Sequence, residues 1–351
     1  MASQNGILTS VLKRVSRAFY LSMRILPDGV RQPISLGYLL ARAADTVADT
    51  PNIEAAERLR RLQRLQVYIR NLDAEHFLMA QEACAWTEGV TPGEAKLMQV
   101  FPQALELTAQ LDAEDRGDVQ QVVTTLISGM VLDLSFFPGR FTENVQLDRY
   151  TYLVAGCVGE FWSRIIARHT PALHGWDCEH WSQIGVRFGK ALQLTNVLRD
   201  AVKDLENGRS YIPGLVREPW PDCAGQQGSD YYEAAMANLN RTQTNDILGQ
   251  WIETALEHYC CAIAYTLSLP WHCWRLRLAV IWPIAIGLAT LAKLCDCSED
   301  WLKRGRRIKV ERRWVYRMIA LTVPLSLYTQ GLQRWLESWW HRADAGSHRL
   351  H

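Results

Sequence analysis

The chain has 351 residues, enough to bury a large hydrophobic core in one or two domains. Lys and Arg number 38 against 37 Asp and Glu, so nothing in the charge balance points to nucleic acid as a partner. Nine scattered cysteines without a CxxC pair argue against a zinc site and a disulfide framework, and they fit a reducing cytoplasm.

Apolar residues recur at helical spacing along almost the whole chain, and few segments alternate with the period of a strand. Helices are expected over residues 7–26, 31–49, 52–71, 92–111, 115–137, 147–168, 181–207, 229–267, 274–294 and 311–340. Proline ends the first two, and Thr91-Pro92-Gly93-Glu94 has the spacing of a capping box. No composition shift divides the chain. We therefore expect a single all-α domain over residues 1–340 around a central cavity, and a disordered tail over 341–351.

The most apolar late segments, 278–294 and 318–332, are each interrupted by a proline and are shorter than a clean membrane span. The start of the chain lacks the unbroken apolar core of a signal peptide. No transmembrane helix is expected.

The stretch 193–213, QLTNVLRDAVKDLENGRSYIP, carries the most telling chemistry. Asn196, Asp200 and Asp204 follow one another at steps of four residues, so they project from one broad face of a helix. Carboxylate and amide oxygens are hard ligands of the kind that Mg²⁺ takes. Taken alone, the run would be a solvated helix face with paired charges. A second acidic pair one turn apart, Asp45 and Asp49 in LARAADTVADT, favours the metal interpretation instead.

Two such helices lying antiparallel could hold several Mg²⁺ ions that neutralise a diphosphate and help it leave. Arg199 and Arg209 among the acids suit a phosphate-bearing substrate. The rest of such a cavity is expected to be apolar, to accept a hydrocarbon chain and keep water from a carbocation. The aromatic faces of Tyr38, Tyr150 and Phe19 could stabilise that cation, although each of them alone is the kind of residue that fills a core.

In this order, the motifs resemble the squalene/phytoene synthase family, the head-to-head prenyl synthases. The segments that carry the resemblance are SRAFYLSMRILP (16–27), YLLARAADTVADT (38–50), YTYLVAGCVGEF (150–161), QLTNVLRDAVKDLENGRSYIP (193–213) and WPIAIGLATLAKL (282–294). The resemblance implies an all-α isoprenoid-synthase fold. It also implies a prenyltransferase that joins two farnesyl diphosphates with Mg²⁺ to form presqualene diphosphate, on the way to a sterol, hopanoid or carotenoid precursor.

Carried over position by position, the resemblance gives each site residue a role. The metal ligands would be Asp45, Asp49, Asn196, Asp200 and Asp204. The residues that contact the substrate would be Ser16, Arg17, Phe19, Gln193, Arg199 and Arg209. Tyr38, Arg42 and Tyr150 would act at the reacting centre, Arg42 on the diphosphate oxygens and the tyrosines in cation stabilisation or proton transfer.

Squalene synthases add a reductive step, in which hydride from NADPH quenches a rearranged cation. IKVERRWVYR (308–317) resembles their basic nucleotide segment, with Lys309, Arg312 and Arg313 available for a 2′-phosphate. A basic helix start that lies on a membrane surface is an equal alternative.

Two departures from the squalene synthase pattern leave the product open. Leu153 stands where squalene synthases have a tyrosine before VAG, and DAVKD lacks their extra acid beside the final aspartate. The main alternative is therefore a non-reductive relative that makes presqualene diphosphate, dehydrosqualene or phytoene. A class I terpene cyclase would show a DDxxD motif, which is absent. A non-catalytic assembly factor would not need to keep both acidic pairs.

The C-terminal stretch LQRWLESWWHRADAGSHRLH (332–351) is rich in Trp and Arg and resembles an interfacial amphipathic end. It predicts a cytoplasmic protein with peripheral contact to the inner face of a membrane. A frayed helix with a disordered tail is the alternative. Oligomeric state, prenyl chain length and the choice between NADPH and NADH are not fixed by the sequence.

Overall fold

The computed structural model describes residues 23, 25–50, 52–217 and 229–350. Contacts between residues divide the chain into two compact units. Unit 1 comprises residues 1–135 and 160–182, and unit 2 comprises residues 136–159 and 183–351. The expectation of a single domain stays a prediction. The all-α prediction is confirmed, because the strands in the described part are two residues long and form one parallel pair.

The elements in chain order are α3 (Asp28–Asp49), α4 (Ala55–Arg70), α5 (Ala74–Met79), η1 (Ala80–Ala85), α6 (Pro92–Ala109), α7 (Ala113–Phe136), β1 (Gly139–Arg140), α8 (Asn144–Thr151), η2 (Tyr152–Gly156), α9 (Cys157–His169), η3 (Pro171–Leu173), α10 (Cys178–Glu206), β2 (Arg209–Ser210), α11 (Ser229–Ala237), α12 (Thr244–Ser268), η4 (Trp271–Cys273), α13 (Trp274–Asp296), η5 (Ser298–Asp300), α14 (Arg312–Leu325) and α15 (Thr329–Ser347). The expected helices over 31–49, 92–111, 115–137 and 274–294 are confirmed to within a few residues. The predicted capping box is also confirmed, with Thr91 and Glu94 bonded reciprocally and Pro92 in the first turn of α6.

Two long predicted helices are each divided by a turn. The predicted helix over 229–267 becomes α11 and α12. The backbone between them forms hydrogen bonds with residues 215–217 instead of continuing the helix: the carbonyl of Asn238 accepts from the N–H of Arg217, and the N–H of Asn240 donates to the carbonyl of Leu215. The predicted helix over 311–340 becomes α14 and α15, and α14 ends at Leu325, one residue after Pro324. The short α5 and η1 were not predicted.

The end of the chain differs from the predicted disordered tail. Residues 341–347 form the last turns of α15, which packs on α12 and α13. Leu336 and Ala343 are fully buried in that contact, and the indole N–H of Trp340 donates to the carbonyl of Leu256 at 3.0 Å. Apolar burial along one face therefore keeps this segment helical.

In unit 1, α3 packs against α4 and α6. A Cβ atom at Gly37 would lie 3.2 Å from the ring of Phe161, so α3 approaches α9 closely at this glycine. The amide of Gln120 on α7 donates to the last two carbonyls of α4, Ile69 and Arg70, each at 2.9 Å. The contacts of α3 with α4, α6 and α9 make it an inner helix of unit 1.

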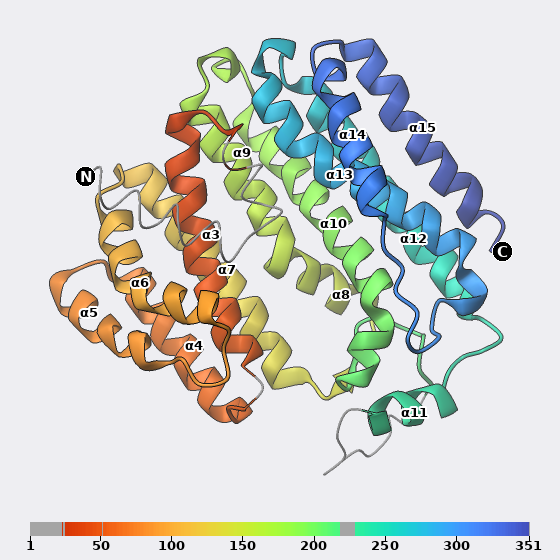
Figure 1. Cartoon of the computed structure of the whole chain (residues 1–351), viewed down its shortest axis with the longest axis horizontal. Helices are drawn as coiled ribbons and strands as arrows, with labels where there is room; N and C mark the ends of the chain where they lie inside the picture. Colours follow the sequence, from red (N-terminus) through yellow and green to blue (C-terminus); the bar gives the residue numbers. More distant parts are fainter. Residues whose placement is uncertain (1–22, 24, 51, 218–228, 351) are drawn as a thin grey trace. The chain divides into compact units, whose positions relative to one another are not determined.

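In unit 2, α13 is the most deeply buried helix and packs against α12, α14 and α15 (Figure 1). α10 crosses the π-turn η2 at Gly189, where a Cβ atom would lie only 2.2 Å from the carbonyl oxygen of Ala155. Only glycine permits so close an approach of two backbones. This crossing holds α10, just before its acidic motif begins at Gln193, against η2, which contains Val154, Ala155 and Gly156.

Within the described residues, two stretches are long and apolar enough to span a membrane by length and composition, α7 and the stretch Trp271–Asp296. In the second, 72% of the apolar window is buried inside the protein, as in the core helix of a soluble protein. Length and composition alone are weak evidence for a span. The eight cysteines that the structure describes are free thiols.

Candidate active site

α3 is buried around most of its circumference and accessible along one stripe. Tyr38, Arg42, Asp45 and Asp49 lie on that stripe at steps of three and four residues, which is the spacing of one helix face. The positions between them are mostly buried: Leu39, Leu40, Ala43, Ala44, Val47 and Ala48. The structure therefore brings the predicted residues of the first acidic motif together on the one side of α3 that a ligand can reach.

Arg42 links two acids of unit 1. Its Nη1 donates to the carboxylate of Asp45 on the same helix, and its Nη2 donates to Oε1 of Glu94 on α6 at 2.8 Å. Glu94 also accepts from the backbone N–H and the hydroxyl of Thr91 in the capping box. Sequence analysis gave Glu94 only the capping role, because nothing local to residue 94 signals a partner 52 positions away.

The surroundings of Asp45 disfavour the ionised form of its carboxyl group. Burial is the main cause and the charge of Asp49 the second, and together they raise the pKa of Asp45 to about 6 against the opposing effect of Arg42. The side chain is still 37% exposed, so the carboxylate is not sealed from solution. A divalent cation between the two acids would remove the repulsion that now favours the proton.

The second motif lies on α10 in unit 2. Gln193, Asn196, Asp200 and Asp204 are all half-buried and follow at steps of three and four residues, while their neighbours Leu194, Val197, Leu198, Ala201 and Leu205 are buried. The amide of Asn196 donates to Oε1 of Gln193 at 3.3 Å. Arg199 binds Asp200 through two N–H groups, with Nε 3.0 Å from Oδ1. Each acidic motif thus pairs an aspartate with an arginine of its own helix.

Tyr150 lies in an aromatic cluster of unit 2 rather than on an open face. Its side chain is 9% exposed, and its ring stacks on Tyr211 with centroids 4.7 Å apart and planes inclined by 19°. Phe137 and Phe141 pack edge-on against Tyr211 at 4.8 and 5.6 Å. The β1–β2 pair holds the cluster, since the N–H of Phe141 donates to the carbonyl of Ser210.

Sequence analysis did not assign a role to Tyr211 or Phe137. Tyr211 belongs to the GRSYIP tail of the second motif, and Phe137 precedes the Pro-Gly loop, so both stand beside segments that were already singled out. The π-turn η2 begins two residues after Tyr150, and such turns are frequent at functional sites.

The loop that follows α13 is tied to the acid-bearing helix of the same unit. The indole N–H of Trp301 donates to the carbonyl of Leu198 on α10 at 2.7 Å. Further along the loop, Nε of Arg304 lies 2.8 Å from Oε1 of Glu206, near the end of α10. The start of the predicted nucleotide segment is therefore anchored to the helix that carries Asp200 and Asp204.

The predicted nucleotide residues lie at the end of this loop and the start of α14. Lys309, Arg312 and Arg313 are exposed, and the carbonyl of Lys309 accepts from Nζ of Lys293 at 2.8 Å. A pocket of about 220 Å³ opens beside them. It is lined by Ala289, Ala292, Lys293, Asp296, Val310, Glu311, Trp314, Trp339 and Arg342, and not by the three predicted residues.

Four further predicted residues remain: Ser16, Arg17, Phe19 and Arg209. Ser16, Arg17 and Phe19 lie outside the described residues. Arg209 is the first residue of β2 and is half-buried. Asp45 and Asp49 belong to unit 1, and Asn196, Asp200 and Asp204 belong to unit 2.

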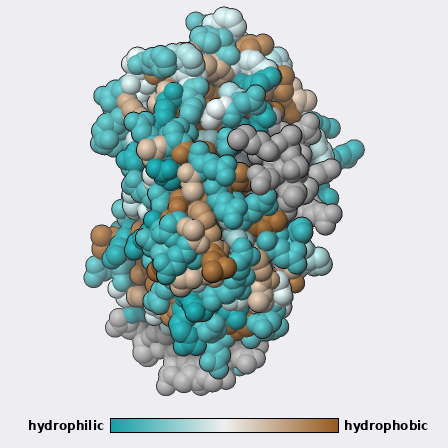
Figure 2. Space-filling model, turned by 90° about the vertical axis from the view of Figure 1, so that its left-hand side faces the viewer, coloured by the Kyte–Doolittle hydropathy of each residue, from teal (hydrophilic) through white to brown (hydrophobic). Residues whose placement is uncertain are grey.

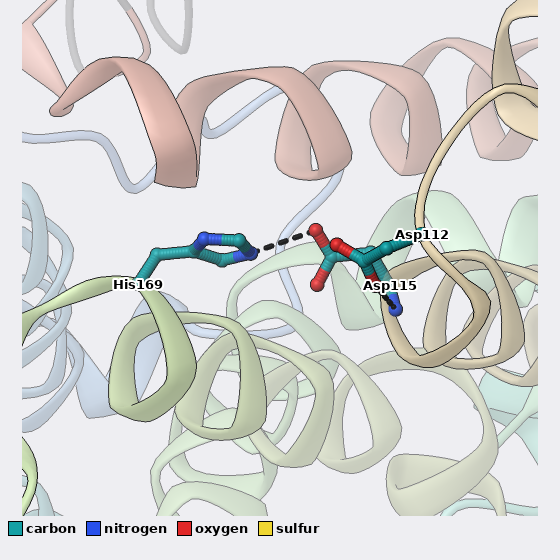
Figure 3. A group of neighbouring side chains, drawn as sticks. All are labelled: Asp112, Asp115 and His169. Atoms are coloured by element: carbon teal, nitrogen blue, oxygen red, sulfur yellow. Dashed lines mark hydrogen bonds and ion pairs between the residues drawn. The ribbon is translucent and has the colours of Figure 1, made fainter.

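A different group of potential metal ligands lies elsewhere in unit 1 (Figure 3). The ring of His169 on α9 points toward Asp112 and Asp115 at the start of α7, and one ligand atom from each lies within 4.8 Å of the others. Asp112 caps α7 by accepting from the N–H of Asp115, and His169 lies 2.7 Å from Asp115. Arg168 also pairs with Asp115, so the acid is already neutralised by a cation. Sequence analysis did not name this group, which joins α7 to α9.

Comparison with known proteins gives a consistent picture. Residues 12–314 match the family model described as squalene/phytoene synthase. Presqualene diphosphate synthase of Zymomonas mobilis is 31% identical over 210 residues, which are 60% of this chain and 60% of that protein. Squalene synthase of Schizosaccharomyces pombe is 24% identical over 266 residues, 74% of this chain and 53% of that protein.

A third relative extends the range of products. The bifunctional lycopene cyclase/phytoene synthase of Phycomyces blakesleeanus is 27% identical over 210 residues, 58% of this chain and 32% of that protein. The chain thus matches 60% or less of the length of these three relatives.

The fold is also that of solved structures. TcSQS in complex with the ligand BPH1237 superposes with a TM-score of 0.69 at 18% identity, covering 99% of this chain and 100% of that chain. At this level of identity the likeness shows a shared helical fold. The family model covers most of the chain and includes both acidic motifs on α3 and α10. The chain therefore belongs to the squalene/phytoene synthase family, whose members are prenyltransferases.

Proposed function

We propose that this protein is a squalene synthase. It would join two farnesyl diphosphates head to head, releasing one diphosphate and one proton as presqualene diphosphate forms, and then reduce that intermediate to squalene. The observation that carries the proposal is the accessible stripe of α3. Two carboxylates, a guanidinium and a phenol on an otherwise buried helix cost folding free energy, and such clusters are typical of binding and catalytic sites.

The donor set suits Mg²⁺. In unit 1 the side chains that would hold it are Asp45 and Asp49, and in unit 2 they are Asn196, Asp200 and Asp204. Such oxygen donors are the ones that Mg²⁺ prefers. Burial and the neighbouring charge of Asp49 raise the pKa of Asp45, so a cation bound there would favour its ionised form. When bound, Mg²⁺ neutralises the diphosphate and assists its departure.

The arginines of the two motifs would change partners as the site fills. Arg42 and Arg199 now neutralise Asp45 and Asp200. When a metal cation neutralises the charge of the aspartate, the arginine guanidinium becomes available to donate to diphosphate oxygens. Arg42 would stay oriented in that state through its bond to Glu94. Gln193 and Arg209 are expected to contribute further contacts to the substrate.

The aromatic residues would act on the hydrocarbon part of the reaction. Tyr38 is half-buried on the open stripe of α3, one turn before Arg42, where its ring can face a developing carbocation. Tyr150 is held by its stack on Tyr211, so its ring has a fixed orientation. A fixed aromatic face stabilises a cation without reorganisation during the reaction.

The reductive step would use the basic segment of unit 2. Exposed Lys309, Arg312 and Arg313 would bind the 2′-phosphate of NADPH, for which guanidinium groups are well suited. When bound, NADPH supplies the hydride that replaces the second diphosphate. The ties from Trp301 and Arg304 to α10 support this assignment, because they hold the loop against the acid-bearing helix.

A non-reductive enzyme is the second candidate. The 31% identity to a presqualene diphosphate synthase favours it, as do Leu153 and the missing extra acid of the second motif. Such an enzyme would release presqualene diphosphate, or convert it to dehydrosqualene; with longer substrates the product would be phytoene.

Product analysis tests the proposal. The purified protein is incubated with farnesyl diphosphate and Mg²⁺, with and without NADPH, beside the variant Asp200→Asn. Squalene only with NADPH, and no turnover by the variant, is the expected result. The same unreduced product in both reactions would replace the reductive proposal by the second candidate. Turnover by Asp200→Asn at the rate of the native protein would remove the second motif from the metal site.

A further inference from the structure

Large exposed hydrophobic side chains gather in two segments of unit 2. In the turn η4 and at the first residue of α13, Trp271 and Trp274 are 59% and 37% exposed. At the end of α14 and in the turn that follows, Leu321, Leu327 and Tyr328 are 47%, 51% and 56% exposed. On the face drawn in Figure 2, by contrast, hydrophobic residues lie in small groups among hydrophilic ones. An exposed apolar cluster of this kind marks an interaction surface.

The two segments lie side by side because a buried arginine joins them. Arg277 is 1% exposed, and its Nε donates to the carbonyl of Leu269 at 2.7 Å. Its Nη1 donates to the carbonyl of Ser326 at 3.0 Å, and its Nη2 to Oγ1 of Thr329 at 3.1 Å. One side chain thus fixes the backbone beside Trp271 next to the turn that carries Leu327 and Tyr328. We call Trp271, Trp274, Leu321, Leu327 and Tyr328 the aromatic patch.

The two segments that carry the aromatic patch have charges of one sign. Residues 268–295 and 312–336 contain no Asp or Glu. Arg275 is exposed with its guanidinium 5.4 Å from the ring centre of Trp274, and Arg317 is exposed on the same outward side of α14 as Leu321. A water-facing surface normally carries both signs of charge, so a purely basic rim is complementary to an anionic partner.

We propose that the aromatic patch binds the surface of a lipid bilayer that carries anionic headgroups. Tryptophan and tyrosine are the residues that favour the membrane–water interface, and nearby arginines attract anionic lipid. A second copy of the chain fits less well, because a two-fold contact through this patch would set the arginines of one molecule against those of the other.

The inference moves the membrane contact away from the C-terminal Trp- and Arg-rich stretch that the sequence suggested. On α15, Trp335, Trp339 and Trp340 are half-buried, and Trp340 is bonded to the carbonyl of Leu256. The ring of Trp339 packs edge-on against Trp314 of α14, with centroids 5.1 Å apart. A bilayer contact through α13 and α14 would place a prenyltransferase next to the phase that takes up a hydrocarbon product.

Vesicle binding tests the proposal without substrate, so the outcome does not depend on the proposed reaction. The full-length protein is co-sedimented with vesicles of phosphatidylcholine containing one third phosphatidylglycerol. The variant Trp271→Ser with Leu327→Ser is expected to bind with a partition coefficient lower by roughly tenfold or more, since both apolar side chains are lost from the interface. A matched control, Leu78→Ser with Val145→Ser, removes two hydrophobic residues outside the patch that are more exposed than Trp271 and Leu327, and it is expected to bind like the native protein.

The double variant Arg275→Gln with Arg317→Gln tests the contribution of the basic residues beside the patch, and it leaves Lys309, Arg312 and Arg313 unchanged. It is expected to lower binding to the anionic vesicles, while vesicles of phosphatidylcholine alone bind native and variant protein equally weakly. Circular dichroism of each variant should match the native protein, because every changed residue is exposed. Unchanged vesicle binding by both patch variants would overturn the proposal. So would a concentration-dependent dimer of the native protein that is lost in the variants while vesicle binding stays the same.

Discussion

The Nη2 atom of Arg42 lies 2.8 Å from Oε1 of Glu94, a bond that joins α3 to α6 within unit 1. The same glutamate closes the capping box of α6 with Thr91. Burial raises the pKa of Glu94, but hydrogen bonds from Thr91 and Arg42 outweigh it, so the pKa lies below its usual value and the side chain stays ionised. Arg42 therefore keeps one anionic anchor when Asp45 is engaged by another cation.

Removing the charge of Glu94 should lower the activity substantially while it changes the free energy of unfolding little. In Glu94→Gln the side-chain amide oxygen can still accept from Thr91, since glutamine also serves in a capping box. The charge-assisted bond to Arg42 is lost, and kcat/KM for farnesyl diphosphate is expected to fall about tenfold, as such bonds contribute roughly 1.5–3 kcal/mol. Steady-state kinetics and thermal unfolding measure the two effects on the same preparation.

The control for this variant is Thr91→Ala, which removes the cap and keeps the ion pair. It should lower the free energy of unfolding by about 1 kcal/mol and leave kcat/KM near the native value. A loss of activity in Thr91→Ala as large as in Glu94→Gln would mean that the glutamate acts only through the stability of α6.

The titration of Asp45 should make both stability and metal binding depend on pH. Its pKa is about 6 in the folded protein against 3.8 as the ordinary value, so between these values the folded state holds more protons than the unfolded state. The free energy of unfolding of the metal-free protein is therefore expected to fall as pH rises through this window and to level off above it. Urea denaturation in the presence of a chelator, over a series of pH values, measures the slope.

Mg²⁺ must displace that proton, so its affinity should decrease as pH falls below about 6. Asp45→Asn is expected to abolish turnover, to retain the fold, and to lose this part of the pH dependence of both stability and Mg²⁺ binding. Calorimetric titration of Mg²⁺ checks the second effect. The same slopes in the native protein and in Asp45→Asn would assign the titration to another group.

The double variant Arg312→Ala with Arg313→Ala tests the nucleotide segment. Both side chains are exposed at the start of α14, so the variant should fold normally. The KM for NADPH is expected to rise by about tenfold or more, because charge-assisted bonds to the 2′-phosphate are lost, while presqualene diphosphate forms at the native rate. Arg334→Ala, an exposed arginine of α15, is the matched control. Native NADPH kinetics in the double variant would remove these residues from the cofactor site.

A buried contact in unit 2 offers a test of the packing. A Cβ atom at Gly287 on α13 would lie 1.8 Å from the hydroxyl of Tyr259 on α12, which is itself 2.9 Å from Oγ1 of Thr195 on α10. Gly287→Ala should therefore lower the free energy of unfolding by roughly 1–3 kcal/mol, the usual cost of overpacking. Chemical denaturation measures the change.

Two further variants make this packing test specific. Tyr259→Phe in the Gly287→Ala background should recover part of the loss, since it removes the hydroxyl oxygen, which is the atom closest to the new methyl group. Gly117→Ala on α7 has open space around the new methyl group and should stabilise the protein by about 0.5–1 kcal/mol. An equal change in the free energy of unfolding in Gly287→Ala and Gly117→Ala would show that the contact with Tyr259 does not set the effect.

The sequence by itself determined the helical class, the capping box of α6 and the faces on which the two acidic motifs lie. These features depend on the period of the helix and on residues a few positions apart, such as Asp45 and Asp49, and they are therefore readable without a structure. The order of the motifs also determined the family.

Only the tertiary structure decided which partners those residues meet. The bond from Arg42 to Glu94, the stack of Tyr150 on Tyr211 and the packing of α15 all join positions far apart in the chain. The break between α11 and α12 likewise depends on backbone hydrogen bonds made to residues 215–217. Local periodicity fixes which way a side chain points on its own helix. Whether that face meets solvent, an ion or a buried ring depends on the long-range contacts that pack the helices together.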